Sequence, residues 1–157
     1  MGKNKQVAKP FAWKKYAIID GIVLVAVAAA YAGYTSMIPV NSKVPVLGVP
    51  ENMYITSQHA TEGYVFASKS TTGGKKMPGA THVTPVLHIA SGQLASIHFI
   101  NEDTTSKHNF NIDEFNVHSR DLNYFETQSI TFVANKAGTF KYHCTLHPEM
   151  NGEVIVQ

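Results

Sequence analysis

One short segment near the end of the chain constrains its fold more than any other. The only cysteine, Cys144, is followed at three-residue steps by His147 and Met150, and strand-like residues stand on both sides of this segment. A further imidazole, His108, lies upstream in the segment Ser-Lys-His-Asn-Phe. One thiolate, two imidazoles and a weakly binding thioether form a donor set that suits copper. The segment therefore predicts a metal-binding loop between two strands.

The residues before this loop alternate as they would in a β-strand. Successive side chains of a strand point to opposite faces, so Phe140, Tyr142 and Cys144 share one face. We therefore expect Cys144 to end the strand on the side of the core. A second strand is expected at 153–156, and Gly152 just before it is expected to permit the turn.

Zinc is the main alternative metal, because one cysteine and two histidines are also good zinc ligands. The thioether of Met150 argues against zinc, since it suits the softer copper ion. Structural zinc sites also generally bring more thiolates than Cys144 alone supplies. A disulfide within the chain is excluded by the count of one cysteine. The donor set therefore favours copper.

Short strand-like segments fill the chain from about residue 52 onward. Apolar and polar side chains alternate in several of them, and turn-forming residues separate them. In one such segment, Val83, Leu87 and Ile89 are expected to face inward together. This pattern is typical of an all-β protein built as a β-sandwich. The expected strands are 53–56, 63–67, 82–89, 94–100, 109–112, 129–133, 139–143 and 153–156.

An apolar segment precedes this region and predicts a transmembrane helix at 16–38, because about twenty consecutive apolar residues span a bilayer. Five of the thirteen basic residues come before it, and such lysine-rich flanks stay in the cytoplasm. The rest of the chain would then lie outside the cytoplasm, in a single-pass protein of the cell membrane. Asp20 is the exception within the apolar run, and we expect its side chain to reach toward the interface.

A cleaved signal peptide is the alternative, since the residues up to Ala32 resemble a small-residue cleavage site. The apolar run continues past Ala32, and the segment before it is long for a signal, so the anchor is favoured. We expect four parts in the chain. They are a basic cytoplasmic tail at 1–15, the transmembrane helix at 16–38, a proline-rich linker at 39–51 and a copper-binding domain at 52–157.

Charge is distributed unevenly along the chain. From residue 40 onward eight basic residues meet ten acidic residues, a net charge of −2, so the basic pI belongs to the amino-terminal tail. This asymmetry indicates a membrane rather than a nucleic acid as the partner. The histidines other than His108 and His147 are expected at the surface. Among them His143 is the one that adjoins Cys144.

The stretch that runs from Tyr142 through the metal-binding loop to Gly152 resembles the ligand loop of the cupredoxins, and looks most like that of the amicyanins and plastocyanins. The resemblance covers roughly the last seventy residues, from Gly92 onward. It implies a Greek-key β-sandwich that carries one type 1 copper ion. The ligands that it implies are His108, Cys144, His147 and Met150.

The resemblance also gives roles to two residues beside the ligands. Asn109, next to a ligand histidine, would fasten the two ligand loops together, and Thr145 would join it. Such partners fix the orientation of metal ligands. The implied function is that of an electron carrier rather than an enzyme, which exchanges single electrons between a protein donor and a protein acceptor of a respiratory chain.

Two relatives keep other functions open. Subunit II of cytochrome oxidase also has a membrane segment before a cupredoxin domain, so a copper-bearing subunit of a membrane oxidase complex is one alternative. That subunit carries two loop cysteines, whereas this chain has only Cys144 and cannot hold a bridged copper pair. The residues from His108 to Phe115 are similar to those of nitrosocyanin, in which a carboxylate serves where this loop offers Met150. Glu149 therefore keeps open a site that acts on a small molecule such as a nitrogen oxide.

Overall fold

The computed structural model describes residues 13–61, 63–69 and 81–157, and the chain divides into two compact units, Met1–Ser36 and Met37–Gln157. Most of the predicted basic tail, residues 1–12, lies outside the described residues. Each unit is described by itself.

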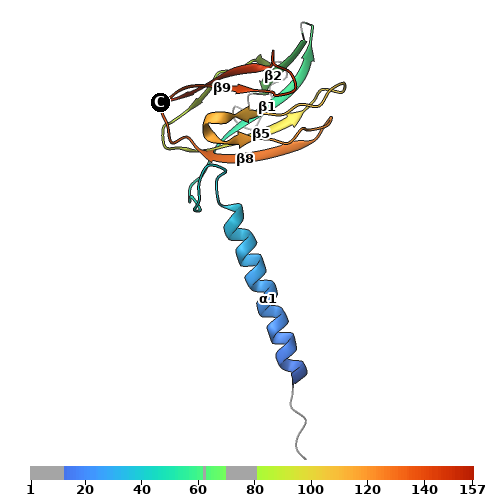
Figure 1. Cartoon of the computed structure of the whole chain (residues 1–157), viewed down its shortest axis with the longest axis vertical. Coiled ribbons are helices and arrows are strands. Elements are labelled where there is room, and N and C mark those ends of the chain that lie inside the picture. Colours follow the sequence, from blue (N-terminus) through green and yellow to red (C-terminus); the bar gives the residue numbers. More distant parts are fainter. Residues whose placement is uncertain (1–12, 62, 70–80) are drawn as a thin grey trace, which may run out of the picture. The chain divides into compact units, whose positions relative to one another are not determined.

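The described part of the first unit is the helix α1 (Trp13–Ser36), drawn in blue in Figure 1. Its apolar side chains are exposed at consecutive positions, with Val23, Leu24 and Val25 at 54%, 70% and 70%, so apolar side chains lie on more than one side of the helix. Its residues Tyr16–Ser36 are long and apolar enough to cross a membrane. The predicted apolar helix is confirmed, and such a helix belongs to a membrane anchor or to a signal sequence.

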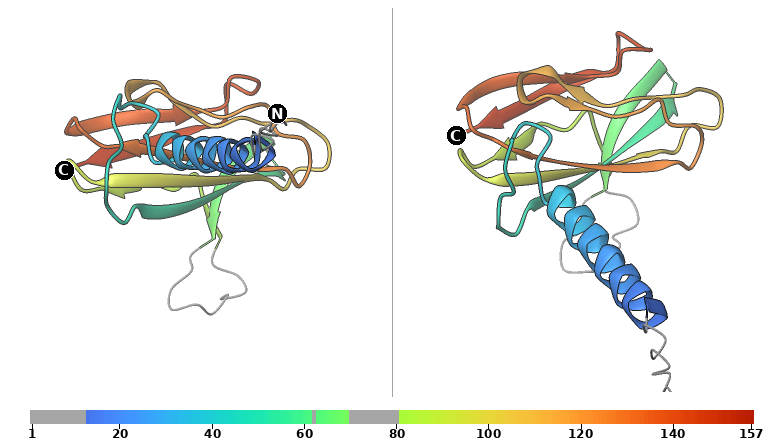
Figure 2. Two further views of the ribbon diagram at one scale, coloured as in Figure 1. Left: turned by 90° about the horizontal axis from the view of Figure 1, so that it is seen from below. Right: turned by 60° about the horizontal axis from the view of Figure 1, so that its bottom comes forward.

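The described residues of the second unit form two five-stranded sheets. The sheets lie as two layers in Figures 1 and 2, and this arrangement confirms the predicted β-sandwich. The first sheet contains, in spatial order, β3 (Thr81–Val83), β2 (Gly63–Lys69), β1 (Glu51–Ala60), β5 (Leu94–Asn101) and β8 (Thr127–Val133). The second contains β4 (Leu87–Ile89), β10 (Asn151–Val156), β9 (Gly138–His143), β6 (Asn111–Ile112) and β7 (Val117–His118). A short 3₁₀ helix, η2 (Asp113–Phe115), joins β6 to β7. Strand β1 runs parallel to β5 and β4 runs parallel to β10, while the other pairings are antiparallel.

Aromatic side chains from both sheets meet in one core. The ring of Phe66 from β2 packs edge-on against the rings of Phe99, Phe110 and Tyr142, with centroids 5.4–6.0 Å apart. Edge-to-face contacts of this kind add to the free energy gained from burial. Tyr142 belongs to the same buried cluster as Cys144. The loop that begins at Cys144 is therefore seated against this aromatic core.

The predicted strand at 82–89 is wrong in one respect, because this stretch forms two strands in different sheets. Strand β3 pairs with β2 in the first sheet, whereas β4 pairs with β10 in the second. Between them Thr84 has a φ of 49°, and Pro85 has no N–H to donate to a ladder. Val83 is consequently 58% exposed, against the expectation that it faces inward with Leu87 and Ile89, which are buried.

Part of the segment predicted as a linker is hydrogen-bonded to β8, an edge strand of the first sheet. The N–H of Val40 donates to the carbonyl of Thr131 at 2.9 Å. The side chain of Asn41 donates to the carbonyl of Val133 at 2.7 Å and accepts from its N–H at 2.9 Å. These bonds occupy backbone groups that an edge strand would otherwise expose.

Candidate metal centre

Three of the predicted ligands meet at one end of the sandwich. Cys144 directly follows β9, His147 lies in the loop between β9 and β10, and His108 precedes β6. One nitrogen from each histidine and the sulfur of Cys144 all lie within 4.8 Å of one another. The Sγ of Cys144 is 3.8 Å from Nδ1 of His147, and the two imidazole centroids are 4.5 Å apart. A single metal ion can therefore be held by all three.

Met150, the fourth predicted ligand, is 1% exposed and belongs to the core cluster together with Cys144. Two backbone hydrogen bonds close the loop around it. The N–H of Cys144 donates to the carbonyl of Met150 at 3.0 Å, and the N–H of Met150 donates to the carbonyl of His147 at 2.9 Å. The loop is thus a compact turn that returns the chain to β10 beside the cysteine.

His108 is completely buried, and a carboxylate fixes its protonation. Its Nε2 lies 2.8 Å from Oδ2 of Asp103, which is itself 3% exposed. Burial lowers the pKa of His108 below its ordinary value of 6.5, against the opposing effect of Asp103. Burial raises the pKa of Asp103, but the hydrogen bonds from His108 and Thr105 outweigh this effect and leave the pKa below 3.8. At neutral pH the pair is therefore a carboxylate and a neutral imidazole.

This ionisation decides which nitrogen of His108 is free to bind a metal. A carboxylate only accepts hydrogen bonds, so the single ring proton resides on Nε2 and Nδ1 keeps its lone pair. Among the described residues, Nδ1 of His108 is the one buried side-chain nitrogen or oxygen that has no hydrogen-bond partner. Leaving such an acceptor unsatisfied costs about 1–3 kcal/mol. A metal ion bound with Cys144 and His147 would satisfy it, and a thiolate with two imidazoles fits copper.

The side-chain amide of Asn109 makes four hydrogen bonds, two of which connect the segment of His108 to the ligand loop at Thr145. Its Nδ2 donates to Oγ1 of Thr145 at 2.6 Å and to Oδ1 of Asp121 at 2.7 Å. Its Oδ1 accepts from the N–H of Thr145 and from Nδ2 of Asn111, both at 2.8 Å. Every donor and acceptor of the amide is therefore used. The structure thus brings together Asn109 and Thr145, the two residues predicted to lie beside the ligands.

Gly152 has a different role from the one expected. It lies within β10 opposite Tyr142 of β9, and its φ is outside the left-handed region that favours glycine, so the expectation that it permits the turn is wrong. A Cβ at this position would lie 2.2 Å from Cζ and Oη of Tyr142. Glycine is required because the tyrosine ring crosses β10 there, which lets its hydroxyl donate to the carbonyl of Pro85 at 2.6 Å.

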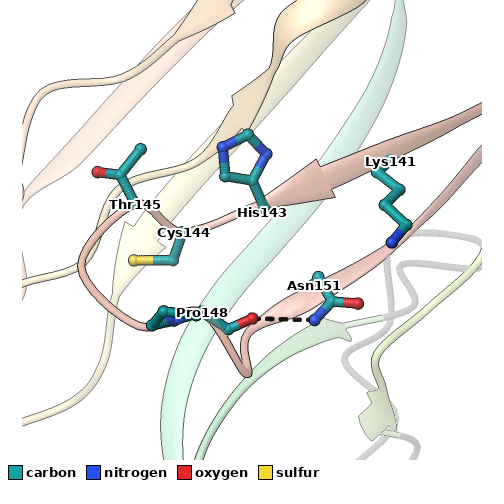
Figure 3. A pocket seen from close by; sticks show the side chains of 6 residues that line it. All are labelled: Lys141, His143, Cys144, Thr145, Pro148 and Asn151. Carbon is teal, nitrogen blue, oxygen red and sulfur yellow. Dashed lines mark hydrogen bonds between the residues drawn. The ribbon is translucent and has the colours of Figure 1, made fainter.

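The outer side of the ligand loop borders a shallow surface pocket of about 330 Å³. Figure 3 shows its lining, where the side chain of Asn151 donates to the carbonyl of Pro148 across the loop at 3.1 Å. His143 and Lys141, at the end of β9, complete this pocket beside Cys144. Solvent or a partner can therefore approach the loop although Cys144 itself is only 1% exposed.

Two residues at the site were not found from the sequence. Asp103 lies in a polar stretch that has the composition of a surface loop, and its contact with His108 depends on how that loop turns. Tyr64 of β2 lies over the ligands, with its ring centroid 4.3 Å from that of His147 and 5.1 Å from that of His108. No local signal marks a tyrosine that comes from a distant strand.

The match to known proteins agrees with this geometry. Residues 78–156, half of the chain, match the family of the cupredoxin-like domain, so the chain belongs to the cupredoxin-like family. A search of curated proteins found no significant match.

Solved structures of similar fold include auracyanin, rusticyanin and a subunit of cytochrome oxidase. Reduced auracyanin from Roseiflexus castenholzii is 17% identical, with 70% of this chain and 99% of that chain covered at a TM-score of 0.49. A variant of rusticyanin is 17% identical, with 69% and 80% covered at 0.49. The periplasmic domain of subunit II of cytochrome oxidase from Bradyrhizobium japonicum is 16% identical, with 71% and 87% covered at 0.47. At these identities the similarity concerns the fold alone.

Proposed function

We propose that this chain is a membrane-anchored type 1 copper protein that carries single electrons between protein partners of a respiratory chain. The observation that carries the proposal is the buried, unpartnered Nδ1 of His108, a residue with one ring nitrogen within 4.8 Å of the sulfur of Cys144 and of a ring nitrogen of His147. Membership of the cupredoxin-like family supports the choice of copper over zinc. The proposed ligands are His108, Cys144, His147 and Met150.

Copper, when bound, supplies a one-electron couple between Cu(I) and Cu(II), and the protein supplies the fixed surroundings. The ligand loop is closed by its own backbone hydrogen bonds and is fastened to the neighbouring loop by Asn109. Cys144 and Met150 are packed into the core, so they have little freedom to move when the charge at the site changes. A rigid donor set favours rapid electron exchange and leaves no open position for a substrate.

The proposed docking face surrounds Leu146 on the ligand loop. Leu146 is 44% exposed although it is apolar, and the neighbouring Pro148 is also exposed. Transient redox contacts are small and weak, so a short apolar face of this kind suits them. We expect Leu146→Lys to slow electron exchange with protein partners while the absorption spectrum of the site is unchanged. Equal rates in the variant and the wild type would rule out this face.

The proposed topology places the amino terminus in the cytoplasm and the copper domain outside it, with a single span in the cell membrane. Lysines of the sequence before the apolar helix and the span Tyr16–Ser36 support it. We propose the boundaries 1–15, 16–38, 39–51 and 52–157 for the tail, the membrane segment, the linker and the copper domain, with the helix itself ending at Ser36. Extraction at alkaline pH separates an anchored chain from a cleaved one, and proteolysis of sealed vesicles reports on which side the domain lies.

Spectroscopy of the copper-loaded full chain in mild detergent tests the function. We expect an intense visible band from thiolate-to-copper charge transfer and a narrow hyperfine splitting in electron paramagnetic resonance, both lost in Cys144→Ser. Copper binding without a thiolate band would overturn the type 1 assignment. Met150→Ala should open the site, so its spectrum should change when a small anion such as azide is added. A wild-type spectrum that already responds to azide would favour the alternative of a small-molecule reaction.

Co-purification tests the remaining alternative of an oxidase subunit. We expect the intact chain to be isolated from mild detergent without stoichiometric partners, because a carrier must dissociate from both its donor and its acceptor. Stable recovery with other membrane subunits would instead place it within an oxidase complex.

A further inference from the structure

The carboxylate of Asp103 is buried against the outer edge of the His108 ring. Asp103 is 3% exposed and His108 is fully buried, and Oδ2 of the first lies 2.8 Å from Nε2 of the second. Burying a charge is expensive unless hydrogen bonds compensate for it. A carboxylate buried beside His108 is therefore unlike the solvated carboxylates of an ordinary surface loop.

Short-range hydrogen bonds hold the carboxylate in one orientation. Thr105 donates twice to Oδ1 of Asp103, from its N–H at 2.9 Å and from its hydroxyl at 2.7 Å. The N–H of Asp103 donates to Oδ1 of Asn101 at 2.9 Å. With Oδ1 accepting from Thr105, Oδ2 is directed at His108.

The loop that carries this carboxylate is itself anchored in the fold. Asn101 at the end of β5 is fully buried, and its Nδ2 donates to the carbonyls of Ser106 and Leu122 at 2.8 and 2.9 Å. The backbone of His108 pairs with Leu122 through two hydrogen bonds, at 3.2 and 2.8 Å. His108 is therefore fixed at its backbone by Leu122 and at its ring by Asp103.

We propose that Asp103 is a positioning residue that holds His108 as the Nε2–H tautomer, presents its Nδ1 to the copper ion, and favours the oxidised ion through its buried negative charge. The copper part of this inference rests on the proposed function, whereas the tautomer part does not. Metal-ligating histidines commonly donate their other ring N–H to a carboxylate, which orients the ring and raises its basicity as a ligand.

The charge of Asp103 acts differently on the two oxidation states. A negative charge in a buried site stabilises Cu(II) more than Cu(I), because the oxidised ion carries one more positive charge. Asp103→Asn keeps the shape of the side chain and removes the charge. It also introduces an NH₂ group. This donor must face either the two donors of Thr105 or the Nε2–H donor of His108, so one hydrogen bond is lost.

The first test uses the metal-free full chain, labelled with ¹⁵N, in detergent micelles. Long-range ¹H–¹⁵N correlations report which ring nitrogen of His108 carries the proton. We expect Nε2–H alone in the wild type and a mixture or Nδ1–H in Asp103→Asn. A wild type with the proton on Nδ1 would overturn the inference, and this result does not depend on whether any variant folds.

The second test compares the affinities of the full chain for Cu(II) and Cu(I). Loss of such a carboxylate partner typically lowers metal affinity about 10- to 100-fold. For Asp103→Asn we expect this loss for Cu(II) and at least tenfold less loss for Cu(I), so that the reduction potential rises by about 59 mV or more. The inference fails if the ratio of the two affinities stays within twofold of the wild type.

Thr105→Val is the matched control. It removes the hydroxyl bond to Oδ1 but leaves the carboxylate against His108, so it should lower stability without changing the tautomer or the affinity ratio. If Thr105→Val shifted the ratio as much as Asp103→Asn, the effect would come from loosening of the loop and the inference would be wrong. Absence of a thiolate band in the wild type would overturn the proposed function, while the tautomer measurement would still decide the role of Asp103.

Discussion

Replacement of Asn109 by alanine tests whether the hydrogen bonds of this side chain hold the ligand loop in place. The substitution removes four hydrogen bonds, two to Thr145, one to Asp121 and one to Asn111. A typical bond of this kind contributes a net 0.5–1.5 kcal/mol, which brackets the loss at about 2–6 kcal/mol. Because Thr145 is exposed, water can replace the hydrogen bonds that it loses. Asn111 is only 4% exposed, so its lost hydrogen bond is not replaced by water. We therefore expect the free energy of unfolding to fall by about 3 kcal/mol.

Scanning calorimetry of the metal-free full chain measures this loss. In a domain of this size about 1 kcal/mol lowers Tm by about 4 °C, so Asn109→Ala should lower it by about 12 °C. Asn151→Ala is the matched control, because Asn151 also bonds the loop twice, at 3.1 Å to the carbonyls of Pro148 and Glu149, but is exposed. We expect the control to lower Tm by less than about 4 °C.

A double substitution shows whether the loss of stability comes from the bonds between Asn109 and Thr145. Thr145→Ala alone should cost about 1 kcal/mol, and it should cost less when Asn109 is already alanine, because the two residues share a bond. Equal shifts for Asn109→Ala and Asn151→Ala, or strict additivity with Thr145→Ala, would refute the reasoning from hydrogen bonds.

Three further predictions concern neighbouring features. Gly152→Ala should cost about 2–4 kcal/mol in urea unfolding, since it displaces the Tyr142 ring and its bond to Pro85, whereas Gly48→Ala, with its nearest atom at 4.0 Å, should be nearly neutral. Tyr142→Phe should cost about 1 kcal/mol by the same measurement, and no loss would mean that the bond to Pro85 is unimportant. The free energy of unfolding of the metal-free chain should fall as the pH drops below 6.5, by at most about 1.4 kcal/mol per pH unit. The reason is that His108 has a lower pKa in the folded state, so the unfolded chain binds the proton first. A second loss is expected below pH 3.8, where unfolded Asp103 is protonated first, and a urea midpoint independent of pH would contradict both.

Much of the copper domain could be predicted from local pattern. The alternation through Tyr142 and Cys144 correctly placed the cysteine on the core side, and the strands at 94–100 and 139–143 appear within one or two residues of their observed bounds. Such patterns succeed because side-chain direction in a strand depends only on its own backbone. The strand at 82–89 failed because alternation does not reveal a change of sheet at Thr84 and Pro85.

The sequence by itself predicted the type of fold and the candidate donors of the site, because Cys144, His147 and Met150 come from one loop whose spacing is local. Only the tertiary structure decided how these donors are held. The carboxylate behind His108, the amide of Asn109 between two loops and the tyrosine ring that passes over Gly152 all depend on segments that meet through folding. Contacts of this kind follow from where whole strands are placed relative to one another, and no periodicity within a single segment encodes that placement.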